Sequence, residues 1–232
     1  MDLSQNVKAV QQRIAAAALK AGRDPASVTL LAATKTQTSD TIRAAIDAGI
    51  TVCGENRVQE LTAHLEANAY AGAEVHFIGR LQTNKVRQVV GRVDLIESVD
   101  SPRLLEAIER QAAGLDLRQD ILIEVNIGGE ESKSGVAPEE LEPLALLALS
   151  LPHVRFRGLM TVPPAGGGRQ IFREMRQLFV DIKRKMPHNE NDIDCLSMGM
   201  SGDYMDAIRE GATQVRVGSA LFGARPPQRP LG

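Results

Sequence analysis

The sequence alternates short apolar runs with helical segments eight times, and this alternation constrains the fold more than any other feature. The predicted strands cover residues 28–33, 51–53, 74–78, 94–97, 121–126, 155–159, 193–197 and 214–217. A helix or a helical turn is expected after each of them. Strict alternation implies a parallel sheet, and eight repeats imply closure into a barrel. The predicted fold class is therefore α/β, a single-domain (β/α)8 TIM barrel.

The length of the chain fits this architecture. It has 232 residues, and a TIM barrel typically needs about 250, so we expect residues 1–232 to form one domain. Within it, residues 1–22 are predicted as an extra N-terminal helix that ends at Gly22, and the Pro/Arg-rich residues 224–232 as a flexible tail. A doubly wound open sheet is the alternative, but no GxGxxG motif follows the first strand.

Composition and charge argue against several classes of function. Lys and Arg total 27 against 29 Asp and Glu, and aromatic residues make up only 3%, which disfavours binding to nucleic acid or to a membrane surface. No apolar run approaches the ~20 residues of a membrane span, and no signal-peptide segment is apparent. Cys53 and Cys195 lack metal-ligand spacing. We therefore expect a cytoplasmic protein without a metal site. The exposed face of the first predicted helix gives no self-association signature, so we also expect a monomer.

A lysine follows the first predicted strand almost at once. Residues 28–37 read VTLLAATKTQ, so Lys35 comes just after a buried segment. A barrel places its functional groups at the C-terminal ends of its strands. A lysine held there by a rigid element suits imine formation with a carbonyl compound. The alternative is a lysine that only marks where the strand meets water.

The loops after the seventh and eighth predicted strands have the composition of a phosphate site. Residues 197–203 read SMGMSGD, and Gly218 and Ser219 follow the last strand. Small residues permit close backbone approach, and the hydroxyls of Ser201 and Ser219 can donate to phosphate oxygens. Barrels often bind phosphate at this position. Two ordinary turns are the alternative.

The first and eighth strands are neighbours in a closed barrel, so Lys35 is expected across the barrel mouth from these loops. A cofactor with an aldehyde on one side and a phosphate on the other would bridge them, and pyridoxal 5′-phosphate (PLP) has that shape. Arg216, two residues before Gly218, would then face the pyridine nitrogen. An arginine cannot accept the ring proton, so the ring would be a weaker electron sink. The alternative for Arg216 is an ion pair inside the barrel, for example with Glu124.

Several longer motifs occur in order: AATKTQ at 32–37, GENRVQE at 54–60, HFIGRLQTNK at 76–85, IEVNIGGEESKSG at 123–135, RGLMTVPP at 157–164, LSMGMSGD at 196–203 and VRVGSALFG at 215–223. In these motifs the chain resembles the pyridoxal phosphate homeostasis protein family. The resemblance implies a PLP-binding barrel related to the alanine racemase N-terminal domain. It implies that Lys35 forms the covalent aldimine and that Arg216 faces the ring nitrogen. The remaining implied site residues are Asn56 beside the cofactor, and Ser201, Gly218 and Ser219 at the phosphate.

Two positions depart from the pattern of many relatives, because Gln37 stands where many have Lys and Thr38 where many have Pro. Both lie on the loop beyond Lys35, and they put in doubt a second basic group at the barrel mouth but not the role of Lys35. Lys133, in the polar loop 128–135, is interpreted as a solvated lysine rather than a contact to phosphate or to a partner.

The resemblance implies a protein that carries and buffers PLP in intracellular PLP (vitamin B6) homeostasis, without robust catalysis, with apo PLP-dependent enzymes as partners. A PLP-dependent amino-acid racemase is the first alternative. It would need a second base opposite Lys35, and Tyr204 is the nearer candidate of the chain's two tyrosines, the other being Tyr70. The second alternative is an aldolase-type enzyme that forms its imine on a sugar phosphate, for which the first strand is an unusual place.

Overall fold

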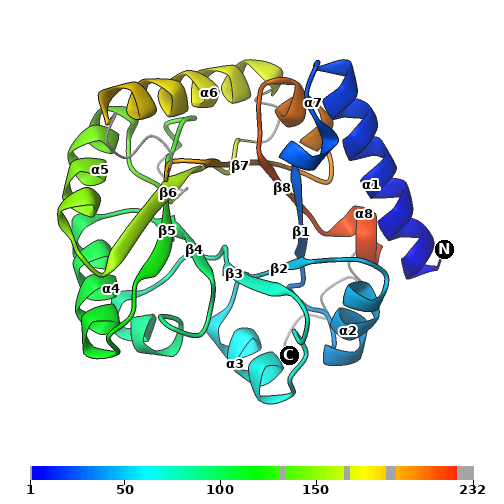
Figure 1. Ribbon diagram of the computed structural model, residues 1–232, viewed down its shortest axis with the longest axis horizontal. Helices are drawn as coiled ribbons and strands as arrows, with labels where there is room; N and C mark the ends of the chain where they lie inside the picture. The colour runs from blue at the N-terminus through cyan, green and yellow to red at the C-terminus, as the bar shows by residue number, and fades with distance from the viewer. Residues whose placement is uncertain (1, 131–133, 165–167, 187–191, 224–232) are drawn as a thin grey trace.

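The computed structural model describes residues 2–130, 134–164, 168–186 and 192–223. Lys133 and the tail predicted over residues 224–232 lie outside the described residues. The strands pair in parallel as a closed barrel in the order β1 to β8, and β8 pairs with β1 to complete it. Figure 1 looks along the barrel and shows the helices arranged around the strands. The predicted (β/α)8 barrel is confirmed.

The strands are β1 (Thr29–Ala33), β2 (Val52–Glu55), β3 (Glu74–Phe77), β4 (Leu95–Val99), β5 (Gln119–Glu124), β6 (Val154–Met160), β7 (Cys195–Met200) and β8 (Gln214–Val217). The α-helices are α1 (Leu3–Lys20), α2 (Ser39–Asp47), α3 (Val58–Glu66), α4 (Pro102–Gly114), α5 (Leu141–Ser150), α6 (Gly168–Lys185), α7 (Tyr204–Arg209) and α8 (Ser219–Phe222). Three short 3₁₀ helices, η1 (Pro25–Ser27), η2 (Thr83–Gln88) and η3 (Pro138–Glu140), complete the described elements.

The predicted N-terminal helix, α1, packs outside the barrel against α7 and α8 (Figure 1). Its buried residues Val7, Val10 and Ile14 recur at helical spacing and form one apolar face. Just beyond the helix, the Arg23 guanidinium donates to the backbone oxygens of Ile208 and Ala212, at 2.9 and 2.8 Å. Helix α1 is thereby tied to the segment that leads into β8.

Apolar side chains pack in two separate clusters. The larger one lies between the strands and the surrounding helices and includes Phe77, Ile121 and Phe172. The smaller one lies in the barrel interior and takes one residue from each of β4 to β7: Leu95, Leu122, Met160 and Cys195. Much of the remaining interior is polar but buried, so the barrel is a packed core and not a pore.

None of the described helices is long and apolar enough to cross a membrane. The described residues also contain no group of three or more His, Cys, Asp or Glu side chains arranged to hold a metal ion.

Candidate functional site

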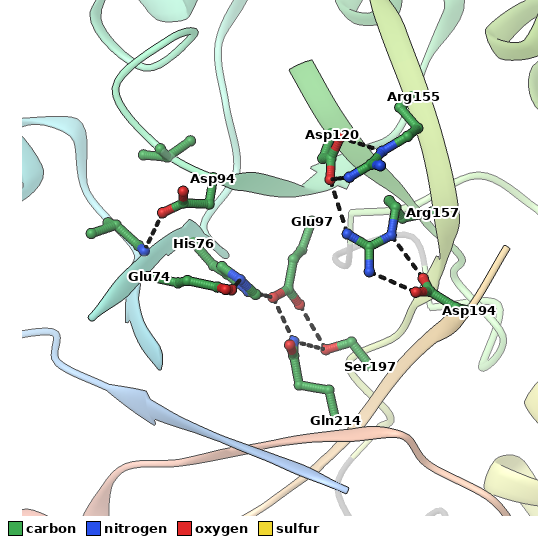
Figure 2. A network of polar contacts seen from close by, with 12 residues as sticks. Glu74, His76, Asp94, Glu97, Asp120, Arg155, Arg157, Asp194, Ser197 and Gln214 are labelled. Atoms are coloured by element: carbon green, nitrogen blue, oxygen red, sulfur yellow. Dashed lines mark hydrogen bonds and ion pairs between the residues drawn. The ribbon is translucent and has the colours of Figure 1, made fainter. Parts of the chain in front are cut away.

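Each mouth of the barrel contains a cavity. The cavity at the N-terminal ends of the strands has a volume of about 610 Å³, and its charged lining includes Asp120, which accepts from both Arg155 and Arg157 (Figure 2). The cavity at the C-terminal ends has a volume of about 440 Å³. All six residues predicted for a cofactor site line this second cavity: Lys35, Asn56, Ser201, Arg216, Gly218 and Ser219. The second cavity is therefore the candidate site, and the ligand roles of the six residues stay predictions.

Lys35 begins the turn between β1 and α2. Thr36 adopts a positive φ of 66°, which is uncommon for a residue other than glycine, and the Gln37 N–H donates to the Thr34 carbonyl at 3.0 Å. The Thr36 N–H also donates to the Glu60 carboxylate on α3, at 3.2 Å. These bonds fix the backbone that carries the half-buried Lys35 at the edge of the cavity.

Thr38, one of the two departures from the family pattern, is the N-cap of α2. Its side-chain oxygen accepts from the Thr41 N–H at 3.2 Å. A threonine in this place satisfies one of the free N–H groups at the start of the helix. Thr38 thus stabilises the start of the helix that follows Lys35.

Ser201 joins the two loops that were predicted to bind phosphate. Its hydroxyl oxygen accepts from the Gly218 N–H at 3.1 Å and from the Ala220 N–H at 3.3 Å. Because the oxygen accepts twice, the hydroxyl proton remains available for donation. Because the Gly218 N–H already donates to Ser201, Gly218 offers a ligand space rather than a hydrogen-bond donor. The N–H of Ser219, at the start of α8, and its hydroxyl are the further donor groups at this wall.

Two observations indicate that the cavity is built to hold a ligand. A Cβ added to Gly218 would meet Ala33 at 3.5 to 3.6 Å, an ordinary contact distance, so packing alone does not require a glycine there. The side-chain oxygen Oδ1 of Asn56 is buried without a hydrogen-bond partner among the described residues. Buried polar atoms are normally paired. The Lys35 amine, the donor groups of Ser201 and Ser219, and the unpartnered Asn56 oxygen together fit a phosphorylated aldehyde such as PLP.

Arg216 forms the inner wall of the cavity and is only 5% exposed. Its guanidinium donates to the Ser197 hydroxyl and to the Thr161 carbonyl, both at 2.7 Å. Burial lowers the pKa of Arg216, while the negative charges of Glu97 and Glu124 oppose that shift. Glu124 thus acts on Arg216 through its charge, and the Glu124 carboxylate itself accepts from Ser134 at 2.8 Å.

Ser197 was predicted as part of the phosphate loop at 197–203, but it lies buried within β7 and does not line the described cavity. The other polar residues behind Arg216 were not singled out from the sequence. The Glu97 carboxylate accepts from Ser197, Gln214 and His76, at 2.6, 2.6 and 2.8 Å (Figure 2). The available signal was the presence of polar residues inside a short, buried strand, as in LIESV at 95–99. Such a residue must point either into the barrel or into the layer of helices, and one sequence does not decide between them.

Neither tyrosine lies in the described lining of the cavity. Tyr204 is 3% exposed, and its hydroxyl has no hydrogen-bond partner among the described residues. Tyr70 is also buried, and its hydroxyl donates to Glu55 at 3.0 Å. The second base that a racemase needs is therefore not supplied by either tyrosine in this arrangement.

Comparison with known proteins identifies the family of this chain. A family model described as the alanine racemase N-terminal domain matches residues 2–226. A pyridoxal phosphate homeostasis protein of Aquifex aeolicus is 44% identical over 233 residues, which cover 97% of this chain and 99% of that protein. The Escherichia coli K12 protein of the same name is 40% identical over 231 residues, 97% of each chain. The chain belongs to the pyridoxal phosphate homeostasis protein family.

Solved structures agree with this assignment. PipY of Synechococcus elongatus, solved with PLP bound, has a TM-score of 0.80 and 34% identity, covering 92% of this chain and all of that one. An alanine racemase of Clostridium difficile has a TM-score of 0.72 at 13% identity, covering 96% of this chain and 57% of that one. The second likeness shows the fold alone. The family resemblance predicted from the motifs is confirmed.

Proposed function

We propose that this pyridoxal phosphate homeostasis family member binds PLP and takes part in intracellular PLP homeostasis by carrying and buffering the cofactor. The observation that carries the proposal is the convergence of Lys35, Arg216 and the Ser201–Ser219 wall on one cavity. The names of the relatives and the PLP-bound structure of PipY support the same conclusion.

The lining suggests a separate task for each residue. When bound, PLP supplies a reactive aldehyde, and Lys35 is proposed to hold it covalently as a Schiff base. The hydroxyls of Ser201 and Ser219 are proposed to donate to the phosphate. Arg216 would donate to the ring nitrogen, and the free Oδ1 of Asn56 would accept a hydrogen bond beside the ring.

The same arrangement favours storage over robust catalysis. Arg216 is held between Ser197 and Thr161. A guanidinium in this position donates to the ring nitrogen and does not protonate it, which limits the ability of the ring to accept electrons. Because no tyrosine lines the described cavity, the racemase alternative is not favoured. We further propose a cytoplasmic monomer that passes PLP to apo PLP-dependent enzymes.

Absorption spectroscopy with two lysine variants tests the proposal. The purified protein, incubated with PLP and then freed of unbound PLP, is expected to show a visible band that borohydride removes, and the reduced cofactor should remain on the peptide that contains Lys35. Lys35→Ala is expected to lose the band because it lacks the amine. Lys85→Ala is the matched control, since Lys85 is half-buried near the same mouth but does not line the cavity.

Wild-type protein that is colourless once unbound PLP has been removed would contradict PLP binding, and equal loss of the band in both variants would contradict the assignment to Lys35. If the band forms, incubation with single L-amino acids in deuterated water tests catalysis. Rapid exchange of the α-proton with formation of the enantiomer would make the protein a racemase.

A further inference from the structure

A chain of hydrogen-bonded polar side chains crosses the barrel interior and ends at the cavity. Arg216, in the cavity wall, donates to the Ser197 hydroxyl at 2.7 Å. That hydroxyl lies 2.6 Å from Oε2 of Glu97, and Oε1 of Glu97 lies 2.8 Å from Nδ1 of His76. His76 lines the cavity at the opposite mouth. Figure 2 shows Glu97 between His76, Ser197 and Gln214.

The direction of each hydrogen bond follows from the number of protons. An ionised carboxylate only accepts, so the single proton of Ser197 is donated to Glu97. The lone pairs of the Ser197 oxygen then face the two remaining donors, Arg216 at 2.7 Å and Gln214 at 3.1 Å. Glu97 therefore fixes the orientation of the hydroxyl, and the hydroxyl fixes one end of the Arg216 guanidinium.

The charges along this hydrogen-bonded series alternate, because the anionic Glu97 lies between the cationic Arg216 and His76. Burial alone would raise the pKa of Glu97, but the hydrogen bond and charge of His76, together with the charge of Arg216, hold that pKa below its ordinary value. Glu97 is fully buried. An isolated buried charge is costly, whereas a carboxylate between two cations offsets the cost for all three. Two negative charges therefore stabilise the buried Arg216: Glu97 on β4, on the far side of Ser197, and Glu124 on β5.

We propose that Ser197 and Glu97 are positioning residues for the cofactor site: they set the place and the charge of Arg216 before PLP binds. The inference rests on the proposed function, because it assigns Arg216 to the pyridine nitrogen. Neither residue needs to touch PLP. A guanidinium already held at the ring position loses less conformational entropy on binding, so both residues contribute to affinity through Arg216.

Ser197→Ala is the main test, with Ser98→Ala as the matched control. Both serines are buried on barrel strands, but the Ser98 hydroxyl has no hydrogen-bond partner among the described residues. Ser197→Ala is expected to raise the PLP dissociation constant about tenfold, since a hydrogen bond to a charged group is lost. It is also expected to shift the pH at which the visible band of bound PLP changes. Ser98→Ala should change neither.

Glu97→Gln tests the charge, because it keeps the size of the side chain. It is expected to weaken PLP binding and to shift the same pH-dependent band. A purely structural role would lower the melting temperature without moving that band. In case either variant fails to fold, ¹⁵N NMR of the wild-type arginine side chains provides a test without substitution. Restricted rotation of the Arg216 guanidinium is expected before PLP is added.

The outcomes separate the two proposals. If wild-type protein binds PLP but a folded Ser197→Ala or Glu97→Gln protein binds it with unchanged affinity and spectrum, the positioning inference is overturned and the proposed function stands. A freely rotating Arg216 guanidinium in the wild-type protein also overturns it. Wild-type protein that binds no PLP overturns the proposed function, and this inference with it.

Discussion

One residue before Lys35, Thr34 is fully buried, and its hydroxyl donates to the Glu55 carboxylate at 2.5 Å. The Tyr70 hydroxyl donates to the same oxygen at 3.0 Å. Burial raises the pKa of Glu55, and the hydrogen bonds from Thr34 and Tyr70 oppose that shift. The turn that carries Lys35 is thus anchored to the buried carboxyl group of Glu55 at the end of β2.

The two tyrosines give a matched pair of predictions about this anchor. Tyr70→Phe is expected to lower the free energy of unfolding by about 1–3 kcal/mol, because Glu55 loses a donor in a buried place. Tyr204→Phe is expected to be neutral or slightly stabilising, since the Tyr204 hydroxyl has no partner among the described residues. Urea unfolding of both variants measures the difference. Equal decreases in the free energy of unfolding would show that the hydrogen bond from Tyr70 to Glu55 does not contribute to stability.

At this scale the sequence predicted the residues at the cavity surface and not those behind them. Lys35, Ser201 and Arg216 lie in motifs at strand ends, where side-chain chemistry can be read directly. Ser197 and Glu97 were each predicted as the last residue of a strand but lie within β7 and β4, where the side to which a residue points decides its role. That side depends on the register of the barrel, which the partner strands determine.

Among the elements, β6 contains an irregularity that changes which side chains face inward. Its pairing with β5 shifts between the pairs Ile121↔Phe156 and Leu122↔Gly158. Phe156 packs in the outer cluster and Met160 in the inner one, although simple alternation would place these two residues on the same face. Gly158 has a φ of +142° at this β-bulge. The bulge lets β6 contribute both Arg157 at one mouth and Met160 deeper in the barrel.

Gly158→Ala is expected to reduce stability severely, by more than about 3 kcal/mol, or to prevent folding. A Cβ at this position would lie 1.9 Å from the Cys195 carbonyl oxygen of β7, and backbone atoms cannot give way cheaply. Gly114→Ala is the control, because no atom lies within 4 Å of its added Cβ. Since Gly114 ends α4, alanine there should be neutral or stabilise by up to about 1 kcal/mol. Similar unfolding midpoints for the two variants would contradict the role of the bulge.

The strands themselves were predictable from the alternation, but their ends were not. The seventh strand was predicted over residues 193–197 and runs from Cys195 to Met200. Its extension follows from pairing with β8, where Met200 lies opposite Arg216. The helical segment expected after the third predicted strand is a 3₁₀ helix, Thr83–Gln88. Pairing and packing between distant parts of the chain decide such boundaries, and local propensity does not contain them.

For the whole molecule, the buried His76 makes stability depend on pH. Burial alone would lower the pKa of His76, but its contacts with Glu74 and Glu97 outweigh burial and raise the pKa to about 9. The ordinary value is 6.5. Between these two values the folded state binds more protons than the unfolded state. The contribution is therefore complete below about pH 6.5 and is lost as the pH rises through about 9.

We expect the free energy of unfolding to fall by on the order of 1 to 2 kcal/mol between about pH 6.5 and 8 through this histidine. His76→Gln can still donate to Glu97 but does not titrate, so its stability should change less over the same range. Urea unfolding at a series of pH values measures both slopes. At higher pH a thiol adds to the loss of stability. Burial raises the pKa of Cys53 from 9.0 to about 12, so above about pH 9 the thiol ionises in the unfolded state before it does so in the folded state. Identical slopes for wild type and His76→Gln would contradict the assignment.

The line of contacts from Glu74 through His76, Glu97 and Ser197 to Arg216 joins the two ends of the barrel without any passage between them. Thermodynamic linkage makes such a connection reciprocal. If a molecule bound beside Arg216 alters the electrostatic balance at Glu97, the proton affinity of His76 changes by the same free energy by which protonation of His76 changes the affinity for that molecule. Occupancy of one mouth then becomes measurable at the other, as a displaced titration curve of a single imidazole.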